Sequence, residues 1–232
     1  AQSPYSFYKK KLAGTMADIG GYSLNCHKHI NTGEGGIIVT NNKAYAKKMR
    51  LIRNHAEASI STKAKKKDLI NMLGYNFRMG EVEASIGIEQ MKKLKKIVKS
   101  RQILANELNK MLRNLDNLLL PKIEKNKTHS FYVYPLIIGK KISNKRQKII
   151  IELKKLGVPG LMEGYTNLVR LPIFQNKIAY GSKGFPWSHF KTKADYSLSN
   201  FKNVEKLNNK TFIGIQLCSY DFNISDIKNI GK

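Results

Sequence analysis

The sequence is poor in cysteine and in long apolar runs. Its two cysteines, Cys26 and Cys218, stand far apart and in no metal-binding spacing with histidine, which argues against a structural zinc site and a disulfide scaffold. We therefore predict no metal site and a reducing, cytoplasmic setting. No apolar run approaches the roughly 20 residues that a membrane-spanning helix needs, and residues 1–11 lack the apolar stretch of a signal peptide. No membrane association is expected.

Acidic residues are also scarce. There are 42 Lys+Arg against 16 Asp+Glu, which gives a formal net charge of +26. Such an excess is typical of nucleic-acid-binding proteins, but these usually gather basic and aromatic residues on one surface. Here the basic runs at 63–67 and 91–99 are separate, which favours a lysine-rich, solvated background. A basic nucleic-acid-binding protein remains an alternative.

What is present is an ordinary globular composition with clear local patterns. The chain has 232 residues, 41% of them hydrophobic, enough for one large domain or two small ones. The β-branched run Ile37–Thr40 predicts a buried strand, and residues 44–55 are spaced as a one-sided helix. Residues 57–68 are polar and basic and indicate a loop. Residues 81–115 predict one long helix, with an apolar stripe and acidic residues in its first turn.

After Pro121 the pattern indicates a small α+β domain. We expect a loop-rich stretch over residues 161–200. The regular elements predicted around it are a strand at 131–138, a helix at 144–156, a helix at 202–208, a strand at 211–217 and a final helix capped by Ser225.

The most informative stretch is residues 18–42, in which Lys28 lies in a polar, glycine-punctuated segment before a strand. Ser23 lies five residues upstream, and a Gly-Glu-Gly-Gly turn follows at 33–36. Chemically, a lysine amine can form an imine with an aldehyde cofactor. A serine hydroxyl can bond a phosphate, and glycines let the backbone approach closely. From the residues alone, an ordinary surface lysine in a loop stays an open alternative.

This stretch resembles the active-site signature of the DegT/DnrJ/EryC/StrS family of sugar aminotransferases, which depend on pyridoxal 5'-phosphate (PLP). The resemblance begins with Tyr22, Ser23 and Lys28, and it continues through Gly33–Gly36 and Val39–Asn42. Further family blocks follow in order: RNHAE at 53–57, LGYNFRMGEVEASIGIEQMKKL at 73–94, RLPIFQNKIAYGSKGFPW at 170–187 and NVEKLNNKTFIGIQL at 203–217. The resemblance covers nearly the whole chain.

The resemblance implies roles for four residues. Lys28 matches the Schiff-base lysine, and it favours transamination over the dehydration run by relatives that carry histidine there. Ser23 matches a phosphate ligand. Gln2 matches a residue near the cofactor's hydroxyl, and Asn76 one that reaches the phosphate of the neighbouring subunit. For Gln2, Ser23 and Asn76, ordinary turn hydrogen bonding is the alternative. The histidines on either side of Lys28 are assigned no role.

The resemblance also implies an α/β fold: part of the large domain of a fold type I PLP-transferase, followed by a small α+β domain. Residues 1–98 would be a remnant of the PLP-binding large domain, and residues 99–232 the continuation of the long helix and the small domain. The implied enzyme is a homodimer with shared active sites. It would move an amino group from an amino acid, expected to be glutamate, to a nucleotide-linked keto-sugar in surface polysaccharide biosynthesis.

Two departures from the family pattern bear on this expectation. The aspartate that would pair with the cofactor's pyridine nitrogen should lie two positions before Ala1. The earlier strands and the glycine-rich helix start are absent too, so we expect this chain to be a carboxy-terminal fragment, inactive alone. Ala56 stands where the family usually has glycine. A catalytically inactive or regulatory relative therefore remains an alternative function.

Overall fold

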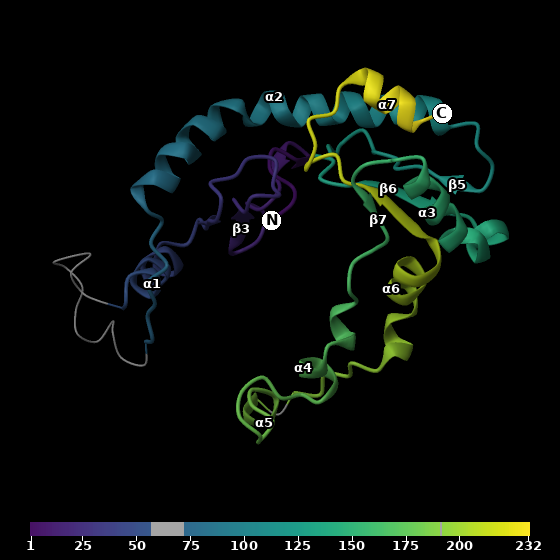
Figure 1. Cartoon of the computed structure of the whole chain (residues 1–232). Coiled ribbons are helices and arrows are strands. Elements are labelled where there is room, and N and C mark those ends of the chain that lie inside the picture. The colour runs from purple at the N-terminus through teal and green to yellow at the C-terminus, as the bar shows by residue number, and fades with distance from the viewer. Residues whose placement is uncertain (57–71, 191) are drawn as a thin grey trace. The chain divides into compact units, whose positions relative to one another are not determined.

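A computed structural model describes residues 1–56, 72–190 and 192–232 (Figure 1). The chain divides into two compact units. The first comprises residues 1–105 and 122–132, and the second comprises residues 106–121 and 133–232. The predicted loop at 57–68 lies outside the described residues. The expected boundary between residues 98 and 99 concerns the domains of the whole protein and stays a prediction.

The first unit contains two short antiparallel hairpins. β1 (Phe7–Tyr8) pairs with β2 (Lys11–Leu12), and β3 (Gly20–Ser23) pairs with β4 (Gly36–Val39). The strand predicted at Ile37–Thr40 therefore exists, but its burial was predicted wrongly, since the Ile38 side chain is 62% exposed. Within the part of the chain that the structure describes, β4 pairs only with β3, and its faces lack a covering layer.

Helix α1 (Lys43–Arg53) confirms the helix predicted after the turn at 41–42. Asn42 caps it, because its side-chain oxygen accepts hydrogen bonds from the backbone N–H groups of Ala44 (2.8 Å) and Tyr45 (3.2 Å). After α1, the backbone of residues 75–77 bonds to residues 52–55. This pairing leads the chain into the next helix.

Helix α2 (Glu81–Leu112) confirms the long helix predicted from Glu81. The predicted apolar stripe is buried only in part. Leu94 and Val98 form a core with Leu24 and Ile30, whereas the stripe residues nearer the start of α2 are exposed: Val82, Ile86 and Met91. An apolar stripe left in solvent at one end of a helix marks a surface that another layer can cover.

The second unit is built on a four-stranded antiparallel sheet. Its order is β5 (Leu118–Leu119), β6 (Tyr134–Ile138), β8 (Phe212–Ile215) and β7 (Leu161–Met162). Strand β6 starts three residues later than predicted, because Phe131 has a φ of 53° and cannot continue a strand. The buried core comprises Leu108, Tyr134, Ile138, Ile150, Ile213, Ile215, Leu217 and Ile227.

The helices of the second unit are shorter than its sequence pattern suggests. The predicted helix at 144–156 is a 3₁₀ turn, η3 (Lys140–Lys145), followed by α3 (Arg146–Lys155). The predicted helix at 202–208 is α6 (Lys202–Lys206), with the 3₁₀ turn η5 (Leu198–Phe201) before it and a π-helical turn, η6 (Leu207–Thr211), after it. The final helix is α7 (Ile224–Ile230), and its cap is Asn223 rather than Ser225.

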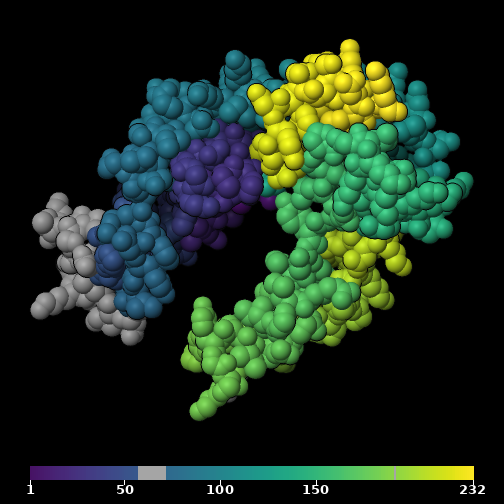
Figure 2. All heavy atoms as spheres, in the orientation of Figure 1, coloured from purple at the N-terminus to yellow at the C-terminus, as the bar shows by residue number. Residues whose placement is uncertain are grey.

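The stretch predicted to be loop-rich leaves the sheet after β7 and returns at α6 (Figure 1). Its green atoms form a projecting arm of the second unit in Figure 2. It carries the short elements η4 (Leu168–Arg170), α4 (Pro172–Gln175) and α5 (Trp187–Phe190). Rings of Phe174, Trp187 and Tyr196 pack together in it. Glu205 ties it to α6 by accepting hydrogen bonds from Arg170 and Asn167. In the described part of the chain, no helix is long and apolar enough to cross a membrane.

Candidate active site

Lys28 lies on a well-ordered turn that joins β3 to β4 in the first unit. The base of the turn is closed by the backbone N–H of Leu24, which donates to the Gly35 carbonyl (2.9 Å), and by that of Thr32, which donates to the Leu24 carbonyl (2.9 Å). Within it, the Lys28 N–H donates to the Asn25 carbonyl (2.9 Å). The position of Lys28 is therefore set by a hydrogen-bonded loop and not by a free surface segment.

Side chains and a glycine tighten this turn further. The Asn25 amide donates to the Glu34 carboxylate at 2.7 Å, and the Thr32 hydroxyl donates to the Glu34 carbonyl at 2.6 Å. Gly35 has a φ of 148°, and a Cβ there would lie 2.8 Å from Thr32 Oγ1 and 3.2 Å from Met79 Cε. The Gly-Glu-Gly-Gly motif thus needs glycine at Gly35 for both backbone and steric reasons.

The Lys28 side chain is half-buried and ends over an aromatic ring. Its Nζ lies 4.7 Å from the centroid of the Tyr132 ring, within the range of a cation–π contact. The neighbouring His29 meets the same ring edge-on, with centroids 6.2 Å apart. Tyr132 and His29 are both buried. Sequence reasoning missed both residues, because Tyr132 was assigned to a strand and His29 was given no role.

The surroundings of Lys28 are basic. Burial, together with the nearby charges of Arg101, His129 and Lys28, lowers the pKa of His29 to about 4. Burial likewise lowers the pKa of His129. Arg101 is buried in α2, and its Nε has no hydrogen-bond partner among the described residues. The positive charges of Lys28 and Arg101 favour an anionic ligand.

Ser23 and Gln2 belong to the same neighbourhood. Ser23 ends β3, and its Oγ accepts a hydrogen bond from the Asn25 N–H at 3.3 Å. The amino terminus of Ala1 donates to the Gly21 carbonyl of β3 at 3.1 Å. The Gln2 carbonyl accepts from the Ser130 hydroxyl at 2.9 Å, two residues before Tyr132. The structure thus anchors Gln2 between β3 and the segment that carries the aromatic ring.

Asn76 lies in a different environment. It is exposed, and it pairs across an antiparallel bridge with Asn54. The rings of its neighbours Tyr75 and Phe77 stack with centroids 4.9 Å apart. Arg78 donates to the Asn54 side chain at 2.5 Å. The contacts that hold Asn76 are therefore made with the end of α1 and not with the turn that carries Lys28.

The residues around Lys28 fit the expected cofactor. A primary amine suits an aldehyde, a hydroxyl five residues away suits a phosphate oxygen, and the basic cluster suits a phosphate dianion. The described residues form no cluster of histidine, cysteine and acidic side chains that could hold a metal ion. These donor types are compatible with an aldehyde and a phosphate.

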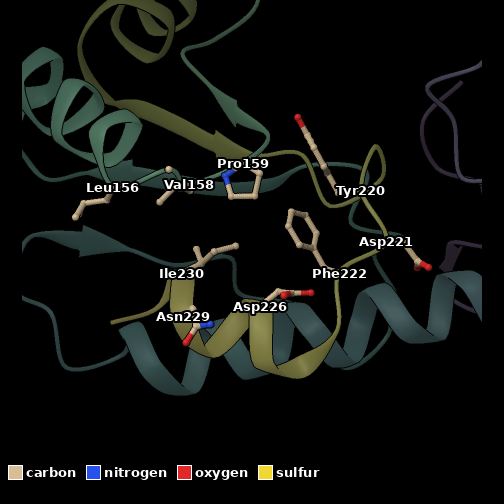
Figure 3. Close-up of a pocket in the computed structure, with 10 residues that line it drawn as sticks. Leu156, Val158, Pro159, Tyr220, Asp221, Phe222, Asp226, Asn229 and Ile230 are labelled. Atoms are coloured by element: carbon tan, nitrogen blue, oxygen red, sulfur yellow. The ribbon is translucent and has the colours of Figure 1, made fainter.

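A cavity of about 390 Å³ lies in the second unit and is a separate feature (Figure 3). It lies between the turn after α3 and α7, and its walls include Val158, Pro159, Tyr220 and Phe222. The carboxylate of Asp226 at its edge already accepts from the Asn223 N–H at 2.8 Å. The four residues predicted to form the active site all belong to the first unit and do not line this cavity.

The fold is that of solved sugar aminotransferases. It matches Helicobacter pylori PseC, an aminotransferase of pseudoaminic acid biosynthesis, with a TM-score of 0.74 and 21% identity, covering 99% of this chain and 56% of that one. It also matches Spr1654 of Streptococcus pneumoniae, a putative sugar aminotransferase, in its pyridoxamine phosphate (PMP) form. The TM-score is 0.78 and the identity 18%, and the match covers 100% of this chain and 54% of that one. The predicted fold class, part of a PLP-transferase large domain with a small α+β domain, is confirmed.

The family follows from the sequence match. The model of the DegT/DnrJ/EryC1/StrS aminotransferase family matches residues 1–211, and the chain belongs to this family. An uncharacterized protein of Methanocaldococcus jannaschii is 32% identical over 197 residues, which is 82% of this chain and 51% of that protein. The GDP-perosamine synthase of Caulobacter vibrioides is 26% identical over 95% of this chain and 54% of its own length. The chain spans about half the length of the relatives it matches.

Proposed function

We propose that the protein carrying this chain is a PLP-dependent aminotransferase. It transfers an amino group from an amino acid, glutamate, to a nucleotide-linked keto-sugar in surface polysaccharide biosynthesis. The observation that carries this proposal is the Lys28 amine, half-buried on an ordered turn inside a basic cluster. Relatives named as GDP-perosamine synthase, an altrosamine transaminase and a spore coat polysaccharide biosynthesis protein support the class of substrate.

Three residues of the first unit would hold PLP, each through a different group. Lys28 would bond it through Nζ, Ser23 would donate a hydrogen bond to a phosphate oxygen, and Gln2 would lie near its ring hydroxyl. Spr1654 has been solved in PLP and PMP forms, which supports this choice of cofactor. When bound, PLP supplies the electron sink that lets a C–H bond next to nitrogen be broken.

The protein's own contribution is proton transfer and exclusion of water. The Lys28 Nζ would accept a proton and return it at a neighbouring atom. Because Tyr132 and His29 are buried beside it, the amine works against an apolar wall that keeps water away on that side. The positive charge of Arg101 attracts the carboxylate of the donor and the phosphate of the cofactor alike.

The homodimer is part of the proposal. Apolar side chains around Asn76 and along the start of α2 lie in solvent: Leu73, Tyr75, Phe77, Met79, Val82, Ile86, Ile88 and Met91. A run of this kind is typical of an interface. Asn76 lies within it, and its neutral amide would donate to the phosphate of a cofactor bound by the partner subunit.

Borohydride trapping tests the function directly. We expect reduction of the protein, expressed at its natural length and loaded with PLP, to fix a pyridoxyl group on the peptide that contains Lys28. Peptide mass spectrometry locates the label. Lys28→Ala should remove it, whereas Lys43→Ala, at the exposed start of α1, should leave it in place. A label on another lysine, or none, would contradict the proposal.

A further inference from the structure

Two consecutive residues of the Lys28 turn contact one ring that comes from about a hundred positions further along the chain. The Lys28 Nζ lies 4.7 Å from the centroid of the Tyr132 ring, and the His29 ring meets it edge-on at 87°. An ammonium group at this distance is attracted by the negative face of the ring. Tyr132 therefore touches the reactive lysine and its neighbour at once.

The Tyr132 ring is held in place from several sides. Its side chain is 7% exposed, and Ser130 beside it is 2% exposed and bonded to the Gln2 carbonyl. The Phe131 N–H donates to His129 Nδ1 at 2.9 Å, and Gln102 of α2 donates to the His129 carbonyl at 3.0 Å. Segment 129–132 is thus tied both to α2 and to the amino-terminal segment.

The Lys28 side chain, by contrast, has four rotatable bonds and little else to direct it. Its backbone is fixed by the turn, but its amine makes no hydrogen bond or ion pair with the described residues. A flexible side chain whose end rests on a rigid surface stays close to its working position more often than one in solvent. Contact with the ring is the one restraint on the Lys28 amine within the described part of the chain.

We propose that Tyr132 is a positioning residue that holds the Lys28 amine at the site whenever the amine is not bonded to cofactor. This inference rests on the proposed function, since it assigns Tyr132 a part in the work of Lys28. The aromatic face is what matters, so phenylalanine should substitute for Tyr132 and leucine should not. If Tyr132 serves only as core, a change to leucine would lower stability without changing the environment of the amine.

Nuclear magnetic resonance of the cofactor-free protein tests the contact without any activity. Reductive methylation with ¹³C-formaldehyde labels the lysine amines, and Lys28→Arg identifies the Lys28 signal. Because its methyl groups would lie over the ring face, we expect their proton resonance upfield of the other lysines. Tyr132→Phe should retain that shift, and Tyr132→Leu should abolish it. A Lys28 signal among the other lysines in the wild type would overturn the proposal.

Phe131 provides the matched control. It is adjacent to Tyr132 and similarly buried, but its ring packs on His129 at 4.5 Å rather than on Lys28. Phe131→Leu should lower the melting temperature about as much as Tyr132→Leu while leaving the Lys28 resonance upfield. If both leucine variants move the resonance equally, the effect is general loosening of the core and the proposal fails.

The kinetic readout separates this inference from the function on which it rests. In the PLP-loaded protein, Tyr132→Leu should slow the half-reaction with the amino donor on the order of ten- to a hundredfold, with little change in KM for the sugar. Tyr132→Phe should react at close to the wild-type rate. If borohydride labels Lys28 but Tyr132→Leu reacts normally, only the positioning role fails. If no label reaches Lys28, the proposed function itself fails.

Discussion

At the scale of single residues, the site contains a buried imidazole, His29, with positive charges near it. Burial removes the water that would otherwise stabilise its charged form, and the charges of Arg101, His129 and Lys28 disfavour that form as well. His29 is therefore neutral at pH 7, and its ring can pack edge-on against Tyr132. A protonated His29 would bring a further positive charge beside the Lys28 amine.

This arrangement predicts a dependence of stability on pH. The pKa of His29 falls from an ordinary 6.5 to about 4 on folding, so the unfolded chain binds the proton more tightly. Neutral His29 therefore stabilises the folded protein. This contribution to the free energy of unfolding is complete above pH 6.5 and is lost as the pH falls toward 4. We expect roughly 2 kcal/mol of the free energy of unfolding to disappear between pH 7 and pH 5 because of His29.

His29→Gln should remove that part of the pH dependence, measured by urea unfolding at pH 7 and pH 5. His129 has a lowered pKa for the same reason and changes stability in the same direction, so a smaller dependence should remain in the variant. Titration of the His29 ring by nuclear magnetic resonance checks the cause. A His29 pKa near 6.5 in the folded protein would contradict the assignment.

Residues close together in the chain were the ones that sequence could locate. Ser23, Lys28 and the Gly33–Gly36 turn form one loop, and their spacing alone brings them together. Tyr132 contacts Lys28, and Arg101 influences His29, only because the fold brings them together. The sequence pattern does not show which distant residues will be neighbours. Phe131 also takes a positive φ, so the strand begins only at Tyr134 and Tyr132 lies outside it.

At the scale of elements, periodicity identified the long helices, as α1 and α2 show. The cap of α1, Asn42, lies in the turn that the sequence indicated before this helix. Burial was predicted less well, because Ile38 and Val82 belong to apolar patterns yet lie in solvent. An apolar pattern indicates that a face is meant to be covered, but the layer that covers it need not belong to the same stretch of chain.

The structure caps α7 with Asn223, whereas the sequence predicted Ser225, and mutation can distinguish the two. Asn223 accepts hydrogen bonds from the N–H groups of Ser225 (2.7 Å) and Asp226 (3.1 Å), and Asp226 bonds back to it. Asn223→Ala should therefore lower the free energy of unfolding by about 1 kcal/mol. Ser225→Ala should have little effect, as judged by urea unfolding of both variants. Equal losses would mean that Ser225 shares the cap.

The extension between β7 and α6 depends on one carboxylate. Glu205 accepts hydrogen bonds from Arg170, Asn167 and Asn209, and these donors hold its pKa at about 2. Glu205→Gln should loosen this stretch, so that limited proteolysis cuts within residues 168–196 faster than in the wild type. Glu152→Gln, which breaks only an exposed pair with Lys155, is the control. Equal cleavage of both variants would contradict the assigned role of Glu205.

At the scale of the whole molecule, the chain spans about half the length of the relatives it matches, and its first unit exposes apolar side chains in at least two regions. Ile38 lies on β4, and Phe77 lies beside Asn76. Exposed apolar surfaces of this kind are typical of interfaces. Asn76, on the second of these surfaces, is expected to bond a cofactor. An activity assay can therefore show whether a partner subunit covers this surface.

A mixed-dimer experiment decides whether Asn76 acts across a subunit interface. Asn76→Ala should weaken PLP binding ten- to a hundredfold, since a hydrogen bond to a charged group contributes ~1.5–3 kcal/mol. Lys28→Ala should abolish activity.

In the mixed dimer, one subunit carries Asn76→Ala and the other Lys28→Ala, with different tags and at natural length. If Asn76 serves the partner subunit, both changes fall in the same active site. The other site is then intact, and the purified mixed dimer should recover about half of the wild-type kcat. If Asn76 serves its own subunit, each site carries one lesion and activity stays low. Light scattering confirms that the purified species is a dimer, and low activity in that species rejects the shared site.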